Sequence, residues 1–148
     1  ESQLDRFLLR ITLGYPDRAA ERELLAGGDR RAAAMKLEPL MRPAQLQAAQ
    51  QAVLRVRAAD ALLDYLQALI AATRSGAWFV EGLSPRAGIA LLRVARARAL
   101  MAGRDYVAPD DVQAILPQAV AHRLQPVPGA GRGPIEQVRA MVEAVPIP

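Results

Sequence analysis

The sequence predicts an all-α fold, a bundle of about five to six helices preceded by one lone β-strand. Three observations lead to this class. Ala, Leu and Arg dominate the 148 residues and aromatic residues make up only 4%, a composition that favours helices. The hydrophobic content of 52% is sufficient for a packed core. Helix-start signals recur along the chain, whereas a single segment has the pattern of a buried strand.

That segment is residues 7–13, a nearly continuous apolar run closed by Gly14, Tyr15 and Pro16. Such a run is typical of a strand buried on both faces, as in a parallel sheet. No second convincing strand follows, and a lone strand leaves its backbone donors and acceptors unpaired. We therefore expect the rest of the sheet to lie outside this chain, in an α/β domain of which residues 7–13 are the last strand.

Helices are expected over most of the remaining chain, with a looser link at 29–42 and a Pro/Gly linker at 125–134. Asp17, Asp60 and Ser84 are the expected N-caps. Pro117 is expected to interrupt or kink the helix in which it falls. The predicted helices cover 17–26, 43–57, 60–74, 85–102, 109–120 and 135–144.

Two of these helices have a clear apolar stripe, and the loop between them, residues 75–83, is expected to fold Trp78 and Phe79 back onto the core. The first stripe consists of Leu62, Leu63, Leu66, Leu69 and Ile70. The second consists of Gly88, Leu91, Leu92, Ala95 and Ala99.

The composition excludes several kinds of site. Without cysteine there is no disulfide, thiolate zinc site or cysteine nucleophile, and a single histidine, His122, leaves no His-rich metal site. We expect no metal site in this chain. No apolar run reaches 18 residues and the first residues do not resemble a secretory leader, so we expect a cytoplasmic location. No GxxxxGK loop followed by Ser or Thr occurs, so we do not expect this chain alone to hydrolyse a nucleoside triphosphate.

Arg86 is the first candidate binding residue. It is the second residue of the helix that Ser84 caps, where the helix dipole makes a cation unfavourable by a few tenths of a kcal/mol up to about 1. An anion bound between the guanidinium and the free amides would reverse this sign, and phosphate is the anion that Arg binds best. The alternative is a solvated arginine that carries a small energetic penalty.

Arg6, just before the predicted strand, is the second candidate. An arginine at a domain edge can reach the nucleotide of a neighbouring subunit, and the alternative is a weak surface pair with Asp5. Asp110 and Asp111 are interpreted as partners of a helix dipole rather than as paired carboxylates. His122, near a helix C-terminus, has the same interpretation.

The net charge of +4 is compatible with nucleic acid but does not point to it. Arg93, Arg96 and Arg98 could face nucleic-acid phosphates, although a solvated helix face is the favoured interpretation. We therefore do not expect nucleic acid to be a partner of this chain.

Four segments of the chain form an ordered series. They are 1–7 with Asp5-Arg6-Phe7, the strand ending Gly14-Tyr15-Pro16, Gly82-Leu83-Ser84-Pro85-Arg86-Ala87, and Gly103-Arg104-Asp105-Tyr106-Val107 with Pro109-Asp110-Asp111-Val112. Together they resemble the C-terminal part of a MoxR-family AAA+ ATPase, and the resemblance covers almost the whole chain. The final residues, 142–148, also resemble the usual ending of that family.

The resemblance implies three parts: residues 1–16 as the end of the AAA+ core, 17–124 as the helical lid, and 125–148 as a linker with a C-terminal helix. The ATP-binding Walker motifs would lie upstream.

It also implies roles for individual residues. Arg86 matches the sensor-2 arginine, which contacts the nucleotide phosphates of its own subunit. Arg6 matches the arginine finger, which acts on the adjacent subunit of a ring, although Arg10 and Arg18 are close enough to be alternatives. Tyr15 and Pro16 would border the adenine.

By the same resemblance, the full-length protein is expected to bind ATP with Mg²⁺ in its core and to hydrolyse it. The partners would be that core, neighbouring subunits of a hexamer, and a von Willebrand A-domain protein. The function would be chaperone-like remodelling or cofactor insertion in other proteins.

The sequence departs from the family pattern at two places. Ala108 stands where a Ser or Thr cap is expected, which weakens one helix start by about 1 kcal/mol. The segment Trp78-Phe79-Val80 is more apolar than expected and is a candidate contact surface. The alternative function is a stand-alone helical adaptor or nucleic-acid-binding module that uses the Arg-rich helix face.

Overall fold

The structure is a computed structural model that describes residues 6–27 and 34–147. The described residues are helical with no sheet, so the predicted all-α class is confirmed. Three parts lie outside the described residues: 1–5, which include Asp5; 28–33, which include the beginning of the predicted link at 29–42; and Pro148. The elements are α1 (Arg18–Ala26), α3 (Pro43–Arg55), α4 (Asp60–Arg74), α5 (Pro85–Met101), α6 (Pro109–Val120), the 3-10 turn η2 (Ala121–Arg123) and α7 (Pro134–Ala144).

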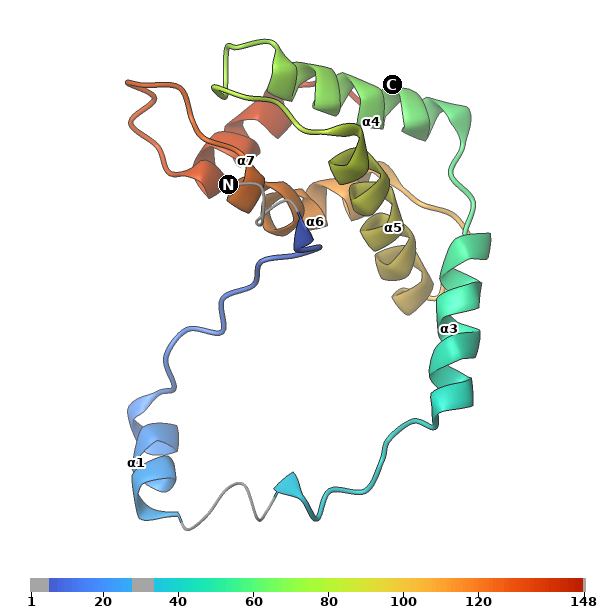
Figure 1. Cartoon of the computed structure of the whole chain (residues 1–148), viewed down its shortest axis with the longest axis vertical. Coiled ribbons are helices and arrows are strands. Elements are labelled where there is room, and N and C mark those ends of the chain that lie inside the picture. The colour runs from blue at the N-terminus through green and yellow to red at the C-terminus, as the bar shows by residue number, and fades with distance from the viewer. Residues whose placement is uncertain (1–5, 28–33, 148) are drawn as a thin grey trace.

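Helices α4 to α7 pack into one bundle, and α3 lies beside α5 (Figure 1). Phe79, Leu91, Val112, Val138 and Met141 are completely buried in the common core. Because the last two belong to α7, the C-terminal helix shares this core with α4, α5 and α6.

Between Phe7 and Pro43 the chain leaves the bundle and returns to it, with α1 at the far end of this excursion (Figure 1). Neither α1 nor α3 has a buried residue. We refer to the described residues of this part, 7–27 and 34–42, as the excursion. No helix of the described residues is long and apolar enough to cross a membrane.

The predicted strand at 7–13 is not formed. These residues are irregular and exposed, and no β-bridge within the described chain involves them. The physical reason is the absence of a neighbouring strand in the described residues, because a strand is stabilised only by its ladder of hydrogen bonds and by packing on its faces.

The predicted loop packing is confirmed, since Phe79 is buried and Trp78 packs against the core. Leu62, Leu66 and Leu69 of the first stripe are buried, but Leu63 is 38% exposed. Leu63 directly follows Leu62, so the two side chains point about 100° apart around the helix, and only one of them faces the core.

The predicted caps at Asp17 and Ser84 are confirmed, because each side chain accepts a bond from a backbone N–H three residues later. Asp60 is instead the first residue of α4, after an Ala59 cap that has no side-chain bond. The helix α6 continues through Pro117 to Val120. Its last turn buries Leu116, Ala119 and Val120, and this packing outweighs the one backbone bond that proline removes.

Candidate functional site

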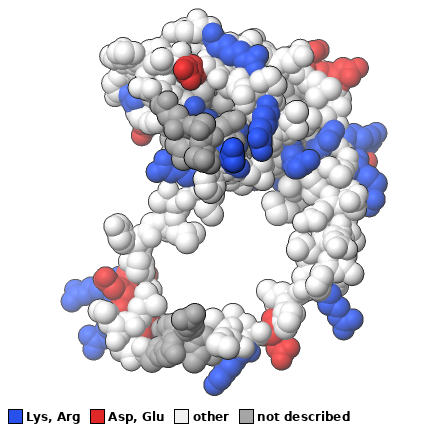
Figure 2. Space-filling view, viewed as in Figure 1, with Lys and Arg blue, Asp and Glu red and all other residues white. Residues whose placement is uncertain are grey.

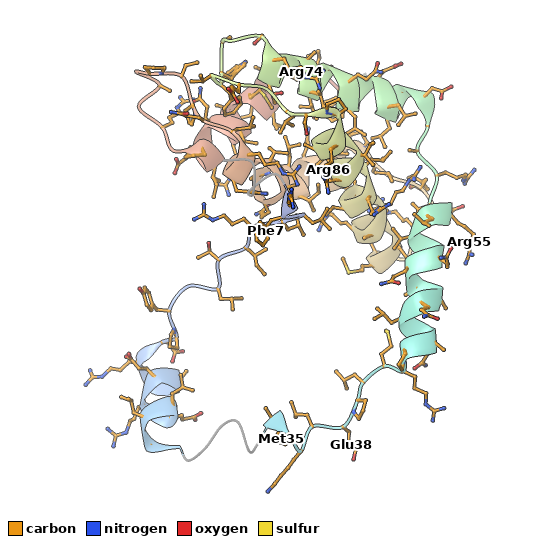
Figure 3. The ribbon with its side chains drawn as sticks, in the orientation of Figure 1. Phe7, Met35, Glu38, Arg55, Arg74 and Arg86 are labelled. Carbon is orange, nitrogen blue, oxygen red and sulfur yellow. The ribbon has the colours of Figure 1, made fainter. Side chains whose placement is uncertain are left out.

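The start of α5 presents Arg86 to solvent. Ser84 is the N-cap, with its Oγ accepting from the Ala87 N–H at 3.2 Å, and Pro85 is the first helical residue. Arg86 follows and is exposed (Figure 3). Within the described residues the Arg86 side chain has no hydrogen bond or ion pair, and its backbone N–H has no partner outside the helix. An exposed guanidinium and a free amide are therefore available at the positive end of this helix.

Two neighbouring residues of α4 fix the backbone immediately before that helix. The Leu83 N–H donates to Thr73 Oγ1 at 3.1 Å, and the Thr73 hydroxyl donates to the Ile70 carbonyl at 2.6 Å. The Arg74 guanidinium donates to the Leu83 carbonyl through Nε at 2.9 Å and Nη2 at 2.7 Å. Both polar groups of the Leu83 backbone are thus held by α4, three residues before Arg86.

Two glycines allow α4 to approach α5 and its preceding loop this closely. A Cβ on Gly82 would overlap the Arg74 side chain at Cγ and would lie 2.8 Å from Arg74 Cα. A Cβ on Gly88 would lie 2.7 Å from Ile70 Cδ1, the end of a flexible side chain. Gly82 is therefore required by contact with backbone, whereas Gly88 borders a side chain that can move.

The loop 75–83 is held from its other side by the segment after η2. The Val80 N–H donates to the Gln125 carbonyl at 2.9 Å, and the Trp78 carbonyl accepts from the Val127 N–H at 3.2 Å and from Gln137 Nε2 at 3.2 Å. A shallow groove of about 410 Å³ lies here, with Trp78 and Arg132 in its lining. Of the predicted contact surface Trp78-Phe79-Val80, only Val80 is exposed, and Phe79 is a core residue.

The connection between α5 and α6 contains an ion pair that the sequence interpretation did not identify. Arg104 donates from Nη1 and Nη2 to the two carboxylate oxygens of Asp111, at 2.6 Å each. Asp111 is buried, and its Oδ2 also accepts from the Ala108 N–H at 2.9 Å. Asp111 thus supplies the carboxylate half of a capping box, whereas Ala108 has no side-chain acceptor for the first-turn amides of α6.

The hydrogen bonds from Arg104 hold the pKa of Asp111 below its ordinary value, with smaller contributions from the Ala108 N–H and the charge of Arg98. Burial acts in the opposite direction and does not reverse the shift. The same pairing raises the pKa of Arg104. Asp111 is therefore more than a partner of the helix dipole, because it accepts bonds from both Arg104 and the start of α6.

The other predicted site residues lie on the excursion or at its beginning. Arg6 is exposed and directly precedes Phe7, which lies where the N-terminal segment meets the bundle (Figure 3). Tyr15 and Pro16 are exposed and precede α1, which lies apart from the bundle (Figure 1). The structure therefore does not bring Tyr15 and Pro16 beside Arg86, and their place near an adenine stays a prediction.

The three arginines proposed for the alternative nucleic-acid face, Arg93, Arg96 and Arg98, differ in exposure and in partners. Arg98 lies 3.5 Å from the Asp111 carboxylate, and Arg96 is half-buried with its Nε enclosed. Only Arg93 is both exposed and without a partner in the described part of the chain. Figure 2 shows basic side chains gathered more on the bundle than on the excursion, but α5 does not supply three equivalent phosphate contacts.

Comparison with known proteins identifies the bundle. The family described as the AAA lid domain matches residues 71–145, which are about half of the chain and contain the end of α4 and all of α5, α6 and α7. This chain belongs to the AAA lid family. The match begins two residues before Thr73 and contains the whole anchored loop, Arg86 and the Arg104–Asp111 pair.

The AAA lid of this chain is of the MoxR type. The chain is 33% identical to the chaperone MoxR1 of Mycobacterium tuberculosis over 133 residues, which are 84% of this chain and 35% of that protein. It is 36% identical to the uncharacterised protein YeaC of Bacillus subtilis over 151 aligned residues, covering 100% of this chain and 47% of YeaC. The chain thus spans about half or less of the length of these relatives.

A solved structure has the same arrangement. The crystal structure of a "putative ATPase" from Cytophaga hutchinsonii matches 99% of this chain with a TM-score of 0.81 and 26% sequence identity, and the match covers 48% of that protein. Because nearly the whole chain is matched, the likeness includes the excursion as well as the lid bundle. The recognition of a MoxR-family AAA+ ATPase from the sequence is confirmed.

Proposed function

We propose that this chain is the nucleotide-sensing lid of a MoxR-type ATPase and that Arg86 contacts the phosphates of bound ATP. The observation that carries this proposal is the exposed Arg86 at the start of α5, which has no partner in the described residues and follows a backbone fixed by Thr73 and Arg74. The position of the lid then differs between ATP and ADP, because the γ-phosphate adds a contact that ADP does not have.

The donor set at this helix start fits a phosphate. The guanidinium and the backbone amide of Arg86 are both donors, and the helix dipole adds positive potential at the same place. The described residues contain no group of three acidic or histidine side chains that could hold a metal ion. We assign ATP and its Mg²⁺ to the core of the full-length protein and only a phosphate contact to this lid.

The exposed apolar side chains indicate that another part of the protein packs against the excursion. Twenty-one large hydrophobic side chains are exposed among the described residues, and fourteen of them lie between Phe7 and Leu54. An apolar surface of this extent is normally covered by protein. We propose that the ATPase core covers it, with residues 1–16 ending the core, 17–124 forming the lid, and 125–148 forming a linker and final helix.

In this assembly Arg6 acts as the arginine finger on the ATP of the adjacent subunit of a hexamer. A finger of this kind stabilises the charge that develops on the transferred phosphoryl group. Arg10 and Arg18 are the alternatives within reach along the chain, and Tyr15 with Pro16 borders the adenine. The relative MoxR1 is named a chaperone, and we propose remodelling or cofactor insertion in other proteins, with a von Willebrand A-domain protein as partner.

Nucleotide binding by the full-length protein distinguishes this proposal from a nucleic-acid-binding module. The measurement is the fluorescence anisotropy of a labelled ATP analogue and, separately, of a labelled oligonucleotide, at low and moderate salt. We expect saturable binding of the ATP analogue that unlabelled ATP displaces, and no binding of the oligonucleotide. Salt-dependent oligonucleotide binding without nucleotide binding would show instead that the module is a nucleic-acid binder.

A further inference from the structure

The segment that carries Arg6 is attached to the lid at one corner, formed by the end of α6 and by η2. The Phe7 carbonyl accepts from Arg123 Nη2 at 2.6 Å, and the Arg10 N–H donates to the Gln118 carbonyl at 2.9 Å. These contacts join residues that are more than 100 positions apart in the sequence. Figure 3 shows Phe7 where the N-terminal segment meets the bundle.

Polar contacts, rather than packing, hold this segment in the described structure. The side chains from Phe7 to Leu13 are exposed, so the burial of apolar surface contributes little to the contact between this segment and the lid. The position of Phe7 relative to the lid then depends on the groups that bind its carbonyl, and the shortest of these bonds comes from a charged donor, Arg123.

His122 also approaches the Phe7 carbonyl, with its Nε2 at 3.1 Å. The same Nε2 lies 3.3 Å from Arg123 Nε, which is always a donor. One imidazole nitrogen of a neutral histidine cannot donate to Phe7 and accept from Arg123 at the same time. Arg123 is thus the donor that holds the Phe7 carbonyl in either tautomer of His122.

We propose that Arg123 is a positioning residue for Arg6, so that the lid controls where the arginine finger is presented. This inference rests on the proposed functions of Arg6 and Arg86. The corner that holds Phe7 belongs to α6 and η2, and α6 packs along α5, which carries Arg86 at its start. A lid movement that follows the phosphates through Arg86 therefore also moves the backbone next to Arg6.

The test is a steady-state ATPase assay of the full-length protein with Arg123→Ala, Arg6→Ala, the double variant and a control, Arg132→Ala. Arg132 is exposed, in the loop before α7. Displacing a catalytic group by 1 Å can cost about 10²-fold in rate. We expect Arg123→Ala to lower kcat at least about tenfold with an unchanged KM for ATP, and Arg132→Ala to behave as wild type.

The double variant shows whether Arg123 acts through Arg6. We expect it to be no slower than Arg6→Ala alone, because a finger that is absent cannot be misplaced. Arg123→Lys, which keeps a donor but not the planar fork, should recover part of kcat. If the melting temperature shows that Arg123→Ala does not fold, the kcat of Arg123→Lys takes its place in the comparison.

Three results would overturn the positioning role: a kcat of Arg123→Ala within twofold of wild type, an additive loss in the double variant, or an equal change of kcat and KM together with a lower melting temperature. A wild-type rate for Arg6→Ala is a different failure, because it removes the proposed finger itself. The two failures are therefore distinguishable in one set of proteins.

Discussion

The guanidinium of Arg74 binds the backbone carbonyl of Leu83 through two nitrogens, Nε at 2.9 Å and Nη2 at 2.7 Å. The first residue belongs to the last turn of α4 and the second lies directly before the N-cap of α5. This bond, together with that between the Leu83 N–H and Thr73, sets the direction in which α5 begins. The position of Arg86 is thus determined by a helix that does not contain it.

Removal of the Arg74 side chain should loosen the start of α5. We expect Arg74→Ala to lower the free energy of unfolding by about 1 kcal/mol, because a charged hydrogen bond at a partly exposed site is lost. It should also weaken ATP binding by the full-length protein. Thermal unfolding and nucleotide titration measure the two effects. Arg55→Ala, at an exposed position in the last turn of α3, is the matched control and should change neither.

The two glycines at the α4–α5 contact should differ in their tolerance of a methyl group. Gly82→Ala places a Cβ against the Cα and Cγ of Arg74 and should destabilise the chain by about 1–3 kcal/mol. In Gly88→Ala, Ile70 Cδ1 can move and alanine has the higher helix propensity, so the net change should be under about 1 kcal/mol. Chemical denaturation compares the two variants. An equal loss in both would contradict the assigned contacts.

The helices could be predicted from the sequence because their signals are local. Ser84 followed by Pro85 and the apolar stripe after it define α5 without knowledge of any other element. The strand at 7–13 could not be predicted correctly in the same way, because a strand forms only against a partner and the described residues supply none. The apolar run predicts that this segment is buried, but it does not indicate which part of the protein packs against it.

The site was only partly predictable for the same reason. The exposure of Arg86 follows from its place in the helix. By contrast, two contacts depend on how segments of the bundle meet: the hydrogen bond from Arg74 to Leu83 and the ion pair of Arg104 with Asp111. Nothing in the spacing of these residues marks them as partners. The interpretation of Asp111 as a dipole partner does not include these bonds, and its position three residues after Ala108 is the available sequence signal for a cap.

The Arg104–Asp111 pair should make stability dependent on pH. The pKa of Asp111 is lower in the folded chain, so its contribution is complete above the ordinary aspartate value of about 4 and is lost as the pH falls through the folded value. Asp111→Asn should cost about 2 kcal/mol at neutral pH. The difference from wild type should shrink in acid.

Urea unfolding between pH 7 and pH 3 measures this dependence. Asp110→Asn, an exposed neighbour in the same helical turn, is the matched control and should follow wild type closely. A wild-type advantage over Asp111→Asn that persists unchanged to the lowest pH would contradict the assigned pairing.

The proposed arginine finger should act between subunits. In the full-length protein, Arg6→Ala should lower ATP turnover about 10³-fold or more, whereas Arg10→Ala and Arg18→Ala should have small effects. Mixing Arg6→Ala subunits with subunits that keep Arg6 but cannot bind ATP should restore part of the turnover, because each supplies what the other lacks at a shared interface. No restoration, or an equal loss with Arg10→Ala, would reassign the finger.

The central claim is that Arg86 senses the phosphates of ATP, and the affinity of the full-length protein for ATP measures this most directly. The comparison is between wild type, Arg86→Ala and Arg93→Ala, an exposed arginine two turns further along the same helix. We predict that Arg86→Ala weakens ATP binding about tenfold to a hundredfold, the loss of one charge-assisted bond, and lowers turnover. Arg93→Ala should bind ATP like wild type. Wild-type affinity and turnover in Arg86→Ala, with an unchanged melting temperature, would contradict the claim.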